Sequence, residues 1–160
     1  MNSRLKPKFK NNFKNYVVHR HSFTVVRESN AQPLLLDFPQ KVHDLAIDII
    51  PDDAREHFEA FYTDAQHQLI FTYEISLGTL TAALVHPRDI FGPAMRSLGI
   101  AAIILVHNHP SGDPSPSHED IRLTRQLVDI GREHDIPIKD HVIVGSGTGR
   151  YVSLKERGIV

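Results

Sequence analysis

Apolar and polar positions follow one another along the chain in runs that predict helices and strands. Residues 40–50 place apolar side chains at helical spacing, which predicts a short amphipathic helix. Residues 56–63 and 69–77 are strand-like runs separated by a short polar segment, so we expect a β-hairpin there. A third strand is predicted at about residues 80–85, shortly after Gly78.

The second half of the chain alternates predicted helices with predicted strands. A helix begins at Pro87, a residue suited to the first helical turn, and is expected to end at Gly99. The apolar run 100–106 predicts a buried strand, and apolar residues at helical spacing predict a longer helix over 117–134. Two more strands are expected at residues 136–144 and 151–154. Together these elements predict a single domain of the α/β (or α+β) class, with a mixed β-sheet flanked by helices.

The most informative motif begins where the strand at residues 100–106 ends. His107 and His109 are separated by one residue, and side chains two positions apart on a strand point to the same face. Prolines and a glycine then force a loop, after which Ser117 begins a helix and Asp120 falls in its first turn. Asp120 can therefore turn its carboxylate back toward the two imidazoles. Two histidines and one aspartate leave a fourth tetrahedral position open, as in catalytic zinc sites.

Each half of this motif also has a simpler explanation. Ser117 and Asp120 have the spacing of a helix capping box, although glutamate or glutamine is more usual at the second position. A histidine pair with the same spacing also occurs at His19 and His21. Neither explanation accounts for two histidines at the end of a buried strand, followed by a loop that returns a carboxylate to them. The conjunction therefore favours a metal site.

Hydrolysis by a zinc enzyme also needs a general base, usually a glutamate close to the metal but not bound to it. Glu74 is the candidate, because it is the one acid in the predicted strand 69–77 and lies on the polar face of that strand. A solvent-facing strand residue is the other explanation for Glu74, and the sequence leaves both open. Ser117, beside the predicted metal, can donate a hydrogen bond to a developing oxyanion as well as cap its helix.

The composition narrows the classes of protein that this chain can belong to. Its 160 residues, of which 41% are hydrophobic and 23% charged, suit one globular domain with a substantial core. The absence of cysteine excludes disulfides, thiolate zinc sites and the cysteine-ligated nucleoside deaminases. The longest apolar run is too short to span a bilayer, and no apolar segment of a secretion signal follows the basic N-terminus. We therefore expect a cytoplasmic protein without a membrane segment.

The net charge of −1 conceals an asymmetry along the chain. Residues 1–27 carry seven basic and no acidic side chains, so the remainder carries a net charge of −8. Aromatic residues are interleaved with these basic residues, which is typical of a nucleic-acid-binding arm. The other explanation is a solvated tail that leads into an edge strand at about residues 16–26. Binding of phosphates by such an arm would depend strongly on salt.

The spacing of the motif residues resembles that of the JAMM (MPN-plus) zinc metalloproteases. The wider sequence, residues 105–117 together with 85–89 upstream and 140–145 downstream, is more similar to the RadC-like family. The similarity covers about residues 40–160, so residues 1–39 form a basic N-terminal extension to a RadC-like JAMM/MPN domain.

This resemblance implies a cytidine-deaminase-like JAB/MPN fold with zinc (Zn²⁺) on His107, His109 and Asp120. It also implies hydrolysis of a peptide or isopeptide bond, with a glutamate as general base and Ser117 assisting the oxyanion. The predicted function is therefore that of a zinc-dependent hydrolase, a metalloprotease of the JAMM type with a peptide or amide substrate.

Two departures from the family pattern keep an alternative open. Relatives often carry an acid five positions before the glycine that corresponds to Gly78, where this chain has Tyr73. Glu74 is one position later, which in a regular strand is the opposite face. Full-length RadC proteins also carry an N-terminal helix-hairpin-helix region, and this chain has the basic extension in its place. The alternative is a catalytically weak or inactive, zinc-stabilised interaction module, associated with DNA through its basic N-terminus.

Overall fold

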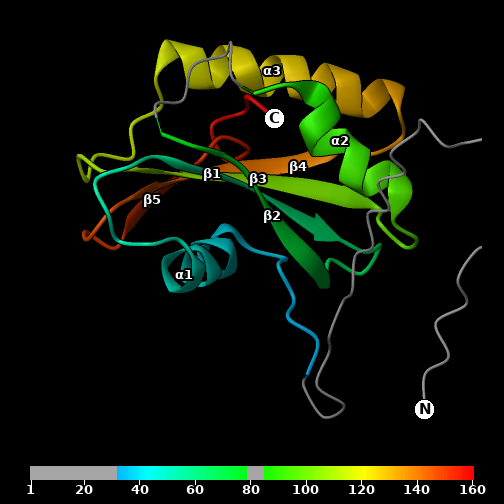
Figure 1. Cartoon of the computed structure of the whole chain (residues 1–160), viewed down its shortest axis with the longest axis horizontal. Helices are drawn as coiled ribbons and strands as arrows, with labels where there is room; N and C mark the ends of the chain where they lie inside the picture. The colour runs from blue at the N-terminus through cyan, green and yellow to red at the C-terminus, as the bar shows by residue number, and fades with distance from the viewer. Residues whose placement is uncertain (1–31, 79–84) are drawn as a thin grey trace, which may run out of the picture.

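A computed structural model of the protein describes residues 32–78 and 85–160 (Figure 1). Within them the chain forms a five-stranded sheet with the strand order β2-β1-β3-β4-β5. The strands are β1 (His57–Thr63), β2 (Leu69–Leu77), β3 (Ala102–His109), β4 (Ile138–Gly145) and β5 (Arg150–Ser153). The strand predicted at residues 80–85 lies mostly outside the described residues, as do the N-terminal arm and the edge strand predicted at 16–26.

The described residues also form three helices, which are α1 (Pro39–Ile49), α2 (Pro87–Arg96) and α3 (His118–Glu133). Figure 1 shows α2 and α3 on one face of the sheet and α1 on the other. A mixed sheet between helical layers confirms the predicted α/β architecture of one domain. The end of α2 differs from the prediction: Ser97 is its C-cap, and Gly99 lies in the turn that follows, with a φ of 86°.

Each face of the sheet has its own apolar core. The core beneath α2 and α3 is built from those helices, β1 and β3; its members include Phe58, Tyr62, Ile90, Ile103, Leu105 and Leu127. The core beneath α1 includes Val42, Ala46, Phe61, Ile104 and Val106. Successive residues of β3 therefore enter opposite cores, and this alternation fixes the direction of every side chain along the strand.

The central strand, β3, continues through both motif histidines and ends at His109, beyond the residue 106 at which the predicted strand ended. It pairs antiparallel with β1 and parallel with β4, and α3 forms the crossover between the two parallel strands. The carboxyl ends of β3 and β4 therefore meet at one edge of the sheet, where ligands commonly bind in α/β proteins. Because His107 continues the row of Ile103 and Leu105, its side chain lies on the face covered by α3.

A β-bulge interrupts the pairing of β1 with β2 close to the predicted base. Phe58 lies opposite Ser76, but the next residue, Glu59, lies opposite Glu74. Ile75 is therefore an extra residue in β2, and it changes the face to which the preceding residues of that strand point. Regular pairing would have placed Glu74 on the face of α2 and α3, whereas the bulge places it on the face of α1.

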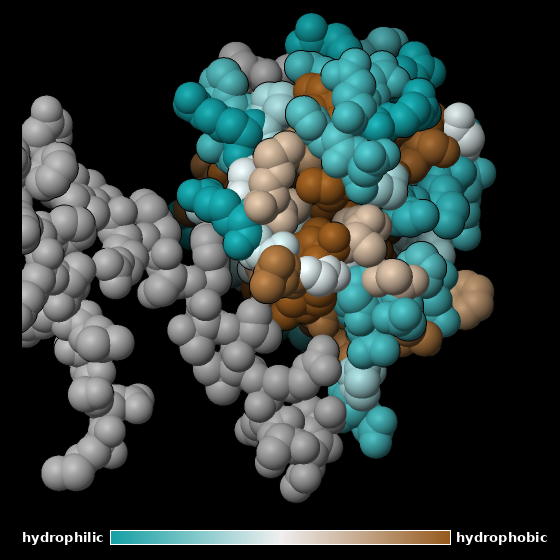
Figure 2. Space-filling view, turned by 90° about the vertical axis from the view of Figure 1, so that its right-hand side faces the viewer, coloured by the Kyte–Doolittle hydropathy of each residue, from teal (hydrophilic) through white to brown (hydrophobic). Residues whose placement is uncertain are grey.

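Apolar side chains also reach the surface of the molecule. Figure 2 shows apolar surface gathered across the middle of one face, between polar regions above and below it. Large exposed apolar side chains include Met95 and Leu98 at the end of α2, and Tyr73 and Leu77 on β2.

Among the residues that the structure describes, no helix has both the length and the apolar character needed to cross a membrane.

Candidate metal centre

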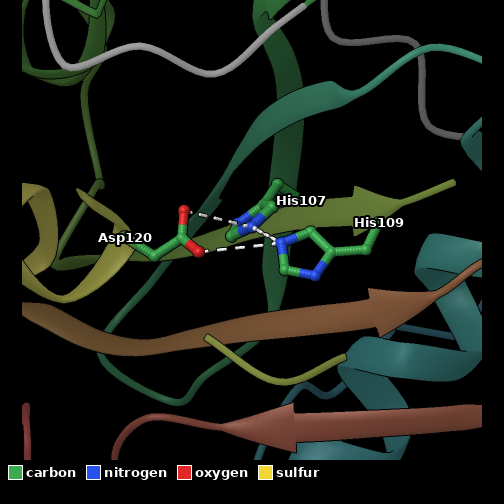
Figure 3. A group of neighbouring side chains, drawn as sticks. All are labelled: His107, His109 and Asp120. Carbon is green, nitrogen blue, oxygen red and sulfur yellow. Dashed lines mark hydrogen bonds and ion pairs between the residues drawn. The ribbon is translucent and has the colours of Figure 1, made fainter. Parts of the chain in front are cut away.

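The carboxyl end of β3 and the first turn of α3 bring three metal-binding side chains together (Figure 3). The Nε2 atoms of His107 and His109 are 2.9 Å apart. Asp120 places Oδ1 3.4 Å from Nε2 of His107 and Oδ2 3.6 Å from Nε2 of His109. One ligand atom from each residue lies within 4.8 Å of the others, so the group could hold one metal ion. The structure thus brings together the three ligands expected from the sequence.

Ser117 and Asp120 form a capping box, and this box also orients the Asp120 carboxylate. The main-chain N–H and the hydroxyl of Ser117 both donate to Oδ2 of Asp120 at 2.7 Å. In return, the N–H of Asp120 donates to the Ser117 hydroxyl oxygen at 3.1 Å. Oδ1 remains directed at His107, so helix capping and metal binding are compatible roles of one side chain.

Hydrogen bonds on the far side of each imidazole orient the ring. His109 donates from Nδ1 to the main-chain oxygen of Asp113 at 2.7 Å, and a carbonyl oxygen can only accept. In a neutral His109, Nε2 therefore presents a lone pair to the group. Nδ1 of His107 lies 2.7 Å from Nε2 of His141, which is completely buried. Two oriented imidazoles and a carboxylate are a donor set that suits a divalent transition metal.

The environment of the group also favours a bound cation. Burial lowers the pKa of His107 well below its usual value, and unfavourable electrostatic interaction with the neighbouring His141 imidazole lowers it further. The hydrogen bond with Asp120 raises the pKa of His109. Burial acts to raise the pKa of Asp120, but hydrogen bonds with His109 and Ser117 and the electrostatic interaction with His107 together bring it well below its usual value. Asp120 is therefore ionised at neutral pH, beside an imidazole that stays neutral.

Glu74, the base expected from the sequence, lies on the other face of the sheet. Its carboxylate is 3.0 Å from Nδ1 of His57, and Nε2 of the same ring is 3.1 Å from Asp53. The bulge at Ile75 is the physical reason, because it turns Glu74 toward the side of α1 while the ligands lie on the side of α3. The structure therefore does not bring Glu74 to the three ligands.

A different acid, Glu56, lies on the same face as the ligands. It directly precedes β1, and its main-chain oxygen accepts a hydrogen bond from the N–H of Gly78 at 2.8 Å, so the ladder with β2 continues through it. Two positions later, Phe58 packs against His107 with ring centroids 6.0 Å apart, and Glu56 shares that face. The carboxylate of Glu56 is near enough to His109 that its charge contributes to the raised pKa of that ring.

Asn108, between the two histidine ligands, holds the main chain on both sides of Glu56. Its Oδ1 accepts from the N–H of His57 at 2.7 Å, and its Nδ2 donates to the main-chain oxygen of Arg55 at 3.1 Å. The same Nδ2 donates to the hydroxyl of Ser146 at 3.0 Å. The strand that carries the ligands is therefore tied directly to the segment that carries Glu56.

Sequence reasoning named neither Glu56 nor Asn108 as a functional residue. A signal for Glu56 was present, because it shares a face with Phe58 in the predicted strand 56–63. To infer from this that Glu56 lies near the histidines, one must know that the strand is next to β3. No local pattern shows which strands are neighbours. Asn108 carried no signal beyond its position between two histidines.

Comparison with known proteins places these features in a family. A family model described as the RadC-like JAB domain matches residues 36–159. The chain is 45% identical over 124 residues to a UPF0758 protein of Syntrophomonas wolfei. These residues cover 78% of this chain and 52% of the relative. A UPF0758 protein of Methanosarcina mazei is 44% identical over 122 residues, which cover 76% of this chain and 52% of the relative. A UPF0758 protein of Methanococcoides burtonii is 49% identical over 106 residues, which cover 66% of this chain and 45% of the relative. The chain spans about half the length of these relatives. On these matches, the chain belongs to the RadC-like JAB domain family.

Proposed function

We propose that the protein is a zinc-dependent hydrolase that cleaves a peptide, isopeptide or related amide bond. The observation that carries this proposal is the convergence of two imidazole nitrogens and an ionised carboxylate at the end of a buried strand. Three protein ligands with one open position are typical of catalytic zinc sites, whereas structural sites have four protein ligands. The resemblance of the motif to JAMM metalloproteases supports an amide bond as the substrate.

In the proposed mechanism the metal activates the water and the carbonyl, and a side chain of the protein transfers the proton. A zinc ion held by His107, His109 and Asp120 would lower the pKa of a coordinated water to about 7 and polarise the substrate carbonyl. Glu56 accepts the proton of the attacking water and delivers it to the amide nitrogen as the C–N bond breaks. We assign this role to Glu56 because it lies on the ligand face and its charge acts on His109, whereas Glu74 lies on the opposite face.

Ser117 is the proposed donor to the oxyanion that develops on the substrate. Its hydroxyl donates to Oδ2 of Asp120 in the structure, so it has to rotate toward the substrate to take this role. The main-chain N–H of Ser117 bonds the same oxygen at 2.7 Å. Asp120 therefore keeps one hydrogen bond from Ser117 after the hydroxyl has turned away, and the carboxylate stays oriented.

A hydrolysis assay at defined metal content tests the proposal. The full chain is stripped with a chelator, reloaded with one equivalent of Zn²⁺, and incubated with fluorogenic peptides and isopeptide-linked substrates. We expect hydrolysis by the reloaded protein and none by the stripped protein. Glu56→Gln should retain zinc and lose roughly 10²–10⁴-fold in rate, the usual contribution of a positioned general base.

Glu74→Gln is the matched control, because it makes the same chemical change on the opposite face of the sheet. We expect this variant to retain its zinc and its rate. Loss of activity in Glu74→Gln, with activity retained in Glu56→Gln, would reverse the assignment of the base. A wild-type protein that takes up no zinc would contradict the proposal itself.

The bulge at Ile75 favours a second candidate, a zinc-stabilised interaction module that does not catalyse hydrolysis. This candidate gains weight because the base expected from the sequence points away from the ligands. Wild-type protein that binds zinc but cleaves none of the substrates would support it. Association with DNA through residues 1–27 would then appear as binding that weakens steeply with added salt.

A further inference from the structure

A chain of three hydrogen bonds runs behind His107 and returns to a second ligand. Nδ1 of His107 lies 2.7 Å from Nε2 of His141, and Nδ1 of His141 lies 2.6 Å from the hydroxyl oxygen of Thr124. That hydroxyl lies 2.6 Å from the main-chain oxygen of Asp120. His107, His141 and Thr124 are completely buried, so these three side chains depend on one another for hydrogen bonds.

The direction of each bond follows from the end of the chain at Asp120. A carbonyl oxygen only accepts, so Thr124 donates its single hydroxyl proton to Asp120. The Thr124 oxygen is then an acceptor, and Nδ1–H of His141 donates to it. A neutral His141 has no proton on Nε2, so this atom accepts from Nδ1–H of His107. His107 is left with a lone pair on Nε2, the atom that faces His109.

The surroundings of His141 keep the ring neutral. Its two nitrogens contact a hydroxyl and another imidazole, and the ring has no exposed surface. A charged imidazole buried without a carboxylate partner would carry a large desolvation cost. Neutrality is what gives the whole chain of bonds one direction, since a doubly protonated ring would donate at both ends.

We propose that Thr124 and His141 are positioning residues for metal binding, which hold His107 in the tautomer that presents an unprotonated Nε2 to the metal. The inference rests on the metal site proposed above and extends it, because neither residue is a ligand. The bonds end on the main chain of Asp120. Helix α3 therefore carries its own ligand, Asp120. Through Thr124 it also orients His107 on β3, because His141 on β4 lies between them.

His109 provides an internal comparison within the same site. Its Nδ1 bonds the main-chain oxygen of Asp113, in the loop that follows β3, and this bond involves no second side chain. A change at Thr124 should therefore alter the protonation of His107 and leave that of His109 as it was. General loosening of the site would affect both rings.

Thr124→Val keeps the shape of the side chain but removes both its donor and its acceptor. Nδ1–H of His141 then has no acceptor, so a proton on Nε2 that donates to His107 becomes the better arrangement. The proton of His107 moves from Nδ1 to Nε2, where it occupies the lone pair that would bind the metal. We expect the Kd for zinc to rise by roughly 10–100-fold, the usual effect of losing a group that orients a metal-bound histidine.

The test measures zinc affinity by competition with a chromophoric chelator. Thr124→Ser retains the hydroxyl and should bind zinc as tightly as the wild type. Thr63→Val is the matched control: Thr63 is also completely buried, but it pairs with Ala102, at the end of β3 farthest from the ligands. Thermal unfolding in the presence of chelator shows whether each metal-free variant is folded.

The tautomer of His107 is a second readout. It can be measured in the wild-type protein, so this part of the test does not depend on whether a variant folds. Two-bond ¹⁵N–¹H correlations of the metal-free protein should show the proton on Nδ1 of His107 in the wild type and on Nε2 in Thr124→Val, with His109 unchanged. Wild-type His107 protonated on Nε2, or Thr124→Val with wild-type zinc affinity, would overturn the inference. Wild-type protein that takes up no zinc would instead overturn the metal site, so the two failures are distinguishable.

Discussion

Glu59→Gln should stabilise the protein above neutral pH and change its stability little in acid. Glu59 lies within β1, with 8% of its surface exposed, and faces Glu74 across the bulge. Burial, followed by the negative charge of Glu74, raises the pKa of Glu59 from 4.5 to about 7, while the charge of His57 acts in the opposite direction. The folded protein therefore holds this proton at pH values where the unfolded chain has released it.

The sign and size of the effect follow from this difference in pKa. Between about pH 4.5 and 7 the folded state binds more protons than the unfolded state, so the free energy of unfolding falls as the pH rises. At about 1.4 kcal/mol for each pH unit, a rise in pKa from 4.5 to about 7 corresponds to a loss of roughly 3 kcal/mol. Below this window the carboxyl is neutral in both states, and above it the loss is complete. Glutamine is neutral at every pH and avoids the loss.

Urea unfolding of the metal-free proteins, followed by circular dichroism from pH 4.5 to 8.5, measures the effect. The variant and the wild type should have nearly equal free energies of unfolding at pH 4.5, and the difference should grow to a plateau above pH 7. Glu74→Gln, which removes the neighbouring charge, should move the upper limit of this window to lower pH. The exposed Glu133→Gln is the control and should shift stability by less than about 0.5 kcal/mol at any pH. A difference between Glu59→Gln and wild type that stays constant from pH 5 to 8 refutes the reasoning.

Four further predictions concern the metal site and its surroundings. Chelation should lower the Tm without unfolding the protein, because both apolar cores are complete without metal; loss of the helical signal at 25 °C would contradict this. His107→Ala should lose bound zinc by elemental analysis, whereas the exposed His86→Ala should keep it. Asn108→Ala should cost about 1–3 kcal/mol, because main-chain groups lose their partners, and should lower kcat more than zinc affinity. Gly145→Ala would drive its Cβ into the main chain of Gly112, so a loss of roughly 1–3 kcal/mol is expected, and an unchanged Tm would refute it.

Local patterns are sufficient to predict most of the secondary structure and the meeting of the three candidate metal-binding side chains. Helix α3 was predicted almost to the residue, because its N-cap Ser117 and its apolar spacing are both local signals. This meeting can be predicted because His107, His109 and Asp120 lie within one short stretch, where strand and helix geometry alone decide which side chains can meet.

Contacts between distant strands could not be predicted in the same way. The bulge at Ile75 decides the direction of Glu74, yet the apolar residues of this strand alternate without interruption across the bulge, so the sequence does not reveal it. The contact of His141 with His107 depends on the parallel register of β3 with β4, which pairs Leu105 with His141. Register is a property of two strands, and the sequence of either strand alone does not contain it.

The ligands and the residues behind them all lie within one β3–α3–β4 unit, residues 102–145, whereas Glu56 reaches the same place through the antiparallel pairing of β1. The proposed metal binding and the proposed general base therefore depend on separate segments of the chain. Under the proposed function, an insertion of one residue between Glu56 and β1 would turn Glu56 to the other face of the sheet and abolish hydrolysis, while the β3–α3–β4 unit would keep its three metal-binding side chains together. Under the proposed function, metal binding and hydrolysis can therefore be lost independently of one another.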